Sequence, residues 1–177
     1  MNAQLQNQQN ENSPEVTFIY AFLGGTIHTL KVQCSYEVMP EKSRVYQPNQ
    51  AIPTDICGVI GLVSNVFRGC VILCFNKKVF LDVMGSMFGE KFSEITDELS
   101  DGVGELLNII FGTAKTAISN AGFSVERAIP IIIKGNNVQI NSLTASGISI
   151  VIPFVHNEDR FHVIVGLGSA QPELKKK

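Results

Sequence analysis

The sequence lacks tryptophan, carries little charge of either sign and contains no long apolar run. Charged residues make up 17% of the 177 residues, and 14 Lys and Arg stand against 16 Asp and Glu, which gives a net charge of −2. Nucleic-acid-binding domains present a basic surface, so this balance argues against nucleic acid as a partner. The apolar runs are shorter than the roughly 20 residues that cross a bilayer, which argues against membrane insertion.

Cysteine and histidine are scarce and are not arranged as metal ligands. The four cysteines form no CxxC pair, and the three histidines lie far apart in the chain. We therefore expect no metal site in this chain. Cys70 and Cys74 lie inside an apolar run, where cysteine acts as a small hydrophobic residue. Such free thiols, together with the lack of a signal peptide in the Asn/Gln-rich start, favour a cytoplasmic location.

The length suits one domain with a short extension at each end. The composition predicts a disordered N-terminal lead-in over residues 1–13, a single domain over 14–170 and a disordered basic tail over 171–177.

Hydrophobic periodicity divides the domain into helices and strands. Steps of three and four between apolar residues predict helices over residues 16–32, 78–88 and 94–120. Apolar, β-branched runs predict a hairpin of strands 56–64 and 67–75, further strands over 123–133, 147–155 and 161–166, and an extended segment over 36–46. This order predicts an α/β domain of the two-layer α+β kind, with long helices packed on a largely antiparallel sheet.

The two halves of the chain resemble each other. Each has a long helix, an extended segment and two strands, and aligning residues 20–30 with 108–118 places Gly24 opposite Gly112. The pattern predicts pseudo-twofold duplicated halves. Chance similarity between two amphipathic helices is the alternative.

The helix predicted over residues 94–120 has an unusual polar face. Its apolar face carries nine residues: Leu99, Val103, Leu106, Leu107, Ile110, Phe111, Ala114, Ala117 and Ile118. The polar face carries Glu105 and Asn108, whose i, i+3 spacing makes them neighbours, with Gly104 and Gly112 beside them. Each glycine costs about 1 kcal/mol relative to alanine inside a helix. A flattened surface beside a carboxylate and a carboxamide suggests that another molecule docks there, whereas the alternative is a solvated face with incidental glycines.

The residues around this face resemble the signature of the CheC/CheX/FliY chemotaxis phosphatases. The likeness lies in Asp101-x-x-x-Glu105-x-x-Asn108, in Pro130 22 positions after Asn108, and in the run Pro130-Ile-Ile-Ile-Lys-Gly135. It extends over about residues 15–168. Thr17 and Tyr20 occupy the corresponding positions of the first helix, so the chain resembles CheX, with one acidic–Asn pair, and a second active site is not expected.

The resemblance implies a CheC-like fold and a phosphatase that hydrolyses the aspartyl phosphate of a phosphorylated CheY-like receiver domain. In that family pattern Asn108 positions the attacking water, Glu105 pairs with a receiver lysine, and Asp101 is a possible auxiliary residue. The glycines on the polar helix face, Gly104 and Gly112, are expected to flatten the interface. The chain itself binds no cofactor, since the receiver supplies Mg²⁺, and a homodimer is implied.

Two other functions remain open on the sequence alone. One is a non-catalytic module that binds a receiver or a motor component through the same helix. The other is a structural dimerisation domain of the same fold. The sequence identifies neither the receiver nor the pathway, which is motility or another signalling system.

Overall fold

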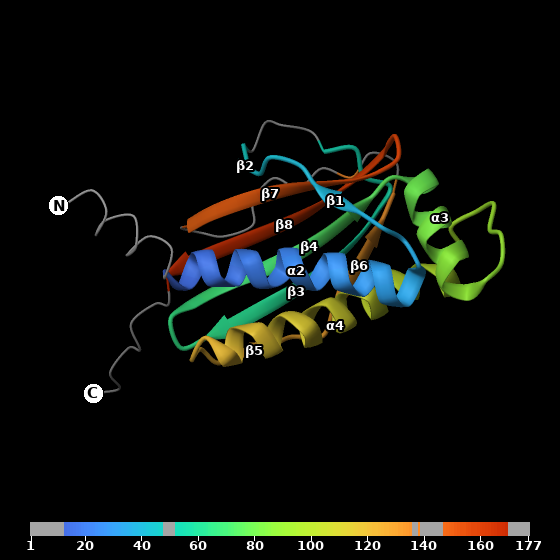
Figure 1. Ribbon diagram of the computed structural model, residues 1–177. Coiled ribbons are helices and arrows are strands. Elements are labelled where there is room, and N and C mark those ends of the chain that lie inside the picture. The colour runs from blue at the N-terminus through green and yellow to red at the C-terminus, as the bar shows by residue number, and fades with distance from the viewer. Residues whose placement is uncertain (1–12, 48–51, 136–137, 139–146, 170–177) are drawn as a thin grey trace.

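Two long helices lie side by side on one face of an antiparallel sheet. The computed structural model describes residues 13–47, 52–135, 138 and 147–169. In this part of the chain, α2 (Pro14–Cys34) and α4 (Asp97–Asn120) cover the same face of an eight-stranded sheet, and the shorter α3 (Lys77–Phe88) packs at one end (Figure 1). The predicted two-layer α+β architecture is confirmed.

The sheet contains four long strands flanked by four short ones. The long strands are β3 (Ile56–Ser64), β4 (Phe67–Phe75), β7 (Gly147–His156) and β8 (Asp159–Ser169). The short strands are β1 (Met39–Pro40), β2 (Arg44–Val45), β5 (Val125–Arg127) and β6 (Ile131–Lys134). The prediction of one continuous strand over 123–133 is wrong, because the chain leaves the ladder before Pro130, which has no N–H to donate.

The sheet topology repeats between the two halves of the chain. The strand order is β1-β7-β8-β4-β3-β5, with β2 also pairing with β7 and β6 with β3. The short strands of each half therefore pair with the hairpin of the other half, and β4 and β8 meet in the middle. This arrangement agrees with the predicted pseudo-twofold halves, with α3 as an addition between them.

Side-chain caps set where the helices begin. Ser13, Asn76 and Thr96 each accept a hydrogen bond from the backbone N–H three residues later. The cap at Thr96 starts α4 three residues after the predicted start at residue 94. Ser13, which was assigned to the lead-in, is part of the folded domain. The rest of the predicted lead-in and the tail over 171–177 lie outside the described residues.

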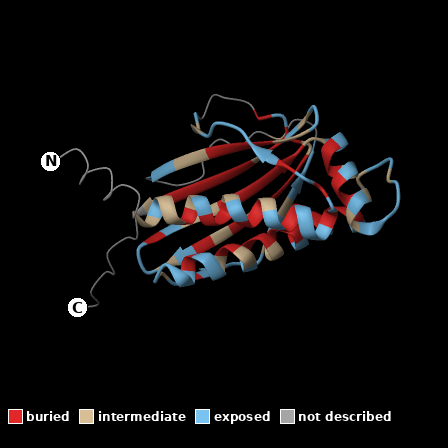
Figure 2. Ribbon diagram, viewed as in Figure 1, coloured by how far each residue is buried: buried red, intermediate tan, exposed pale blue. Residues whose placement is uncertain are grey.

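The core lies between the helices and the sheet. Buried residues form continuous stripes on the inner sides of α2 and α4 and along the middle of the sheet (Figure 2). The two helices approach closely at Gly25, where an added Cβ would lie 3.0 Å from the Ile110 carbonyl oxygen. Of the apolar face predicted for α4, only Ala117 is exposed, because it lies at the edge of the buried stripe. None of the described helices has the length and apolar character to span a membrane.

The cysteines lie within the packed part of the fold. Cys34, Cys57 and Cys74 are buried and Cys70 is half-buried, all as free thiols. Burial raises the pKa of both Cys34 and Cys57 to about 11.

Candidate functional site

The packing of α4 determines which of its side chains face outward. Leu106, Leu107 and Ile110 are buried against the core, so the helix turns Glu105 toward solvent and leaves Asn108 half-buried at the border. Acidic residues Asp97 and Glu98 occupy the first turn, where they interact favourably with the helix dipole. The sequence therefore positions the acidic–amide pair in the middle of a rigid 24-residue helix.

Glu105 and Asn108 contact each other along the helix. The Asn108 amide nitrogen donates to a Glu105 carboxylate oxygen at 3.5 Å, a long hydrogen bond. Because a carboxylate only accepts, the NH₂ group of Asn108 faces Glu105. The Asn108 carbonyl oxygen is shielded from solvent and accepts no hydrogen bond from the described residues. A buried acceptor left unpaired costs about 1–3 kcal/mol, so this oxygen retains an unused capacity to bind a donor.

Gly112 lies on the open side of the same helix. It is exposed, and an added Cβ would meet no heavy atom within 4 Å. No packing constraint in the described structure therefore requires glycine here, although glycine weakens the helix. This is the geometry expected of a position where another molecule approaches the backbone.

Gly104 differs from the prediction that it forms part of an exposed face. It is buried, and an added Cβ would lie 3.5 Å from the Ile132 side chain and 3.8 Å from that of Pro130. Gly104 thus contributes to the packing of β6 on α4 rather than to an open surface. The same contact brings Pro130 next to the turn that carries Glu105, so the distant parts of the sequence signature meet in space.

Several charged residues near Glu105 and Asn108 form ion pairs, but Glu105 does not. Lys115 pairs with Glu126 at 3.1 Å and lies 5.9 Å from the centre of the Phe111 ring. Asp97 pairs with Lys134, which holds the pKa of the Asp97 carboxyl below its usual value through the hydrogen bond and the lysine charge. Asp101 is exposed one turn before Glu105. Within the described residues, Glu105 has no cationic partner.

Exposed isoleucines lie next to this face and were missed by the sequence reasoning. Ile129 is 86% exposed and Ile131 is 63% exposed, on either side of Pro130. The alternation that turns Ile132 inward turns Ile131 outward, since successive strand residues face opposite sides. Attention to this alternation within the apolar run would have identified an exposed apolar rim.

The first helix carries no comparable pair. Tyr20, at the position that corresponds to Asn108, is 66% exposed, and Thr17 stands at the position of Glu105. The described residues also contain no cluster of three or more His, Cys, Asp or Glu side chains that could hold a metal ion. The candidate site is therefore the Glu105–Asn108 face of α4.

Comparison with known proteins gives consistent matches. The family model for "Chemotaxis phosphatase CheX" matches residues 56–155, which is more than half of the chain. A Thermotoga maritima protein named CheY-P phosphatase CheX is 24% identical over 157 residues, covering 88% of this chain and 98% of that protein.

Solved structures share the fold over nearly their whole length. A CheC-like superfamily protein from a Shewanella species is 30% identical, with a TM-score of 0.81, over 87% of this chain and 99% of its own. The CheX of Borrelia burgdorferi, solved in complex with CheY, BeF₃ and Mg²⁺, is 21% identical, with a TM-score of 0.72, over 86% of this chain and 98% of its own.

Proposed function

Since the chain belongs to the CheX family of chemotaxis phosphatases, we propose that it hydrolyses the aspartyl phosphate of a phosphorylated CheY-like receiver domain, with Asn108 and Glu105 as the working residues. The observation that carries this assignment is the Asn108 carboxamide, which Glu105 contacts on one side and whose carbonyl oxygen accepts no hydrogen bond from the part of the chain that the structure describes.

The reaction needs positioning more than acid–base chemistry. A water attacks the phosphorus, the bond between phosphorus and the aspartate oxygen breaks, and the aspartate leaves as a carboxylate while the water's protons pass to phosphate and solvent. The Asn108 carboxamide hydrogen-bonds the water and aims it in line with the breaking bond. The carboxamide does not titrate, so it holds this role across the physiological pH range.

Glu105 docks the receiver. Its carboxylate is exposed and has no cation among the described residues, so it is free to pair with a lysine of the receiver. Removal of water at the interface strengthens such a pair beyond the roughly 0–1 kcal/mol of an exposed one. Its short i, i+3 distance to Asn108 then fixes the register between the receiver and the carboxamide.

The Mg²⁺ ion belongs to the receiver in this proposal. The described residues contain no cluster of side chains that could bind the ion, so this chain does not supply its ligands. The chain acts where the receivers are, in the cytoplasm.

A homodimer is the proposed assembly. The family likeness implies it, and the exposed Ile129, Ile131 and Ile148 provide apolar surface for association. Sedimentation velocity at several concentrations tests it, and a monomer at micromolar concentration would contradict it.

The decay of phosphorylated receivers tests the function. With Mg²⁺ present, the wild-type protein should accelerate loss of phosphate from a cognate receiver. Glu105→Gln should weaken docking and so raise KM, while kcat changes less. Binding of receivers without any acceleration would indicate a non-catalytic module, and the absence of both binding and acceleration would indicate a structural domain.

A further inference from the structure

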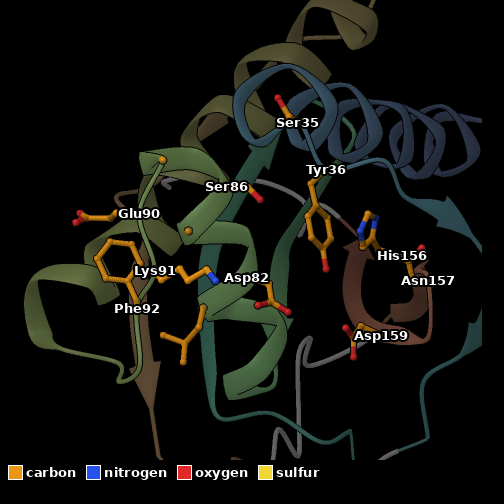
Figure 3. Close-up of a pocket in the computed structure, with 13 residues that line it drawn as sticks. Ser35, Tyr36, Asp82, Ser86, Glu90, Lys91, Phe92, His156, Asn157 and Asp159 are labelled. Atoms are coloured by element: carbon orange, nitrogen blue, oxygen red, sulfur yellow. The ribbon is translucent and has the colours of Figure 1, made fainter.

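A cleft separate from the α4 face lies where α2 ends, beside α3 and the turn between β7 and β8 (Figure 3). It has a volume of about 740 Å³, within the range of about 300–1,000 Å³ typical of small-ligand pockets. None of the residues that line it comes from α4, so the proposed phosphatase site does not account for it.

Tyr36 gives this cleft an unused polar group. The residue is only 5% exposed, and its hydroxyl makes no hydrogen bond among the described residues. The hydroxyl points into the cleft, toward the side of Asp82 and Asp159 (Figure 3). A buried hydroxyl usually has a hydrogen-bond partner, so the lack of one here indicates that a ligand group supplies it.

The wall that carries Tyr36 is rigid. The Tyr36 ring stacks on His156 with ring centres 3.8 Å apart and an interplanar angle of 25°. His156 Nδ1 lies 2.6 Å from the Glu37 carbonyl oxygen. A carbonyl only accepts, so Nδ1 carries the proton and the ring orientation is set. The Tyr36 hydroxyl is thus held in place before any ligand arrives.

Two carboxylates line the cleft, Asp82 on α3 and Asp159 in the same β7–β8 turn as His156. Asp82 has no ion pair among the described residues, and Asp159 pairs with Lys78 at 2.6 Å. Burial and then the negative charges of Asp159 and Asp82 raise the pKa of Tyr36 to about 12, which means that both carboxylates act on the hydroxyl. Lys91 also lines the cleft but forms no ion pair with Asp82.

We propose that this cleft binds an organic cation through a guanidinium group. The planar guanidinium donates two parallel hydrogen bonds to the Asp82 carboxylate and a further one to the Tyr36 oxygen. A metal ion does not suit the cleft, because the described residues contain no cluster of three metal-ligating side chains. The guanidinium belongs to a free small molecule or to an arginine side chain of another protein.

Titration followed by NMR tests the proposal on the full chain. The probes are agmatine, a small guanidinium compound, and a short peptide with one central arginine, with the same peptide carrying glutamine as the blank. Saturable shifts of Tyr36 and His156 are expected with agmatine, the arginine peptide or both. Equal affinity for the two probes would identify a small-molecule site, and at least tenfold tighter peptide binding would identify an arginine side chain.

Three variants distinguish the cleft from general charge attraction. Asp82→Asn and Tyr36→Phe should each weaken binding about tenfold, which corresponds to about 1.4 kcal/mol. Glu158→Gln is the matched control, since it removes the same charge in the neighbouring turn without lining the cleft. The proposal is overturned if neither probe causes a saturable shift at concentrations up to about 10 mM, which is ten times a 1 mM dissociation constant. Equal weakening by Asp82→Asn and Glu158→Gln would also overturn it.

Discussion

Gly112→Ala should make the protein more stable and less active. Nothing lies within 4 Å of the added Cβ, and the residue is exposed in the interior of α4. The change therefore gains only helix propensity, about 1 kcal/mol. For a chain of this length, 1 kcal/mol raises Tm by about 2–4 °C.

The loss of activity follows from the position of the added methyl group. Gly112 lies one turn beyond Asn108, so a methyl there separates a docked receiver from the carboxamide. Misplacement of reacting groups by about 1 Å can reduce a rate by about 100-fold. We therefore expect a drop of at least tenfold in kcat/KM for phosphate loss from the receiver.

Gly24→Ala on α2 is the matched control. Gly24 occupies the corresponding position of the first half and also has no heavy atom within 4 Å of an added Cβ. It should raise Tm by a similar amount and leave phosphatase activity unchanged. Thermal unfolding followed by circular dichroism and the phosphate-loss assay provide the two readouts. Full activity in Gly112→Ala, or equal losses in both variants, would refute the docking role of this face.

Other positions give predictions about stability and reactivity. Gly104→Ala, whose new Cβ has ordinary contact distances, should raise the free energy of unfolding in urea titrations by up to about 1 kcal/mol through helix propensity. Gly102→Ala gains the same propensity, but its Cβ would overlap the Met84 sulfur, so its free energy of unfolding should lie about 1–3 kcal/mol below that of Gly104→Ala. Burial, followed by the Arg44 and Arg160 charges, lowers the pKa of His162 from its usual 6.5 to about 4. Below about pH 6.5 the unfolded state therefore binds more protons than the folded state. The urea midpoint should therefore fall between about pH 6.5 and 5, and less so in His162→Gln; an equal fall in both would exclude His162 as the cause. The buried thiols, whose pKa values are raised, should react with a disulfide reagent at pH 8 only after unfolding. Rapid labelling of three or four thiols in the native protein would contradict their buried positions.

Local patterns were sufficient to predict most of the fold. The β3–β4 hairpin has the predicted bounds, because both strands are largely apolar runs whose paired ends, residues 56–58 and 71–75, are buried on both faces. The duplicated helix–strand order likewise predicted the symmetry of the sheet. Periodicity did not reveal the break before Pro130, since the apolar pattern continues through it while the missing N–H interrupts the ladder.

The site was predictable only where the residues lie on one element. Glu105 and Asn108 are neighbours because of helix geometry, which the sequence determines. The burial of Gly104 depends on β6 packing across α4, a contact between residues 26 or more positions apart. The cleft around Tyr36 and His156 joins residues 120 positions apart, and neither residue lies in a motif that would have indicated it.

The water-positioning role of Asn108 is tested most directly by the rate of phosphate loss from a phosphorylated CheY-like receiver. The rate is measured with wild type and with Asn108→Ala, each at a concentration that saturates the receiver, and receiver affinity is measured in parallel. Asn108→Ala should lower kcat about 100-fold, equivalent to about 2.7 kcal/mol of barrier, while receiver affinity changes little. An Asn108→Ala protein that binds the receiver and retains the wild-type kcat would contradict the water-positioning role.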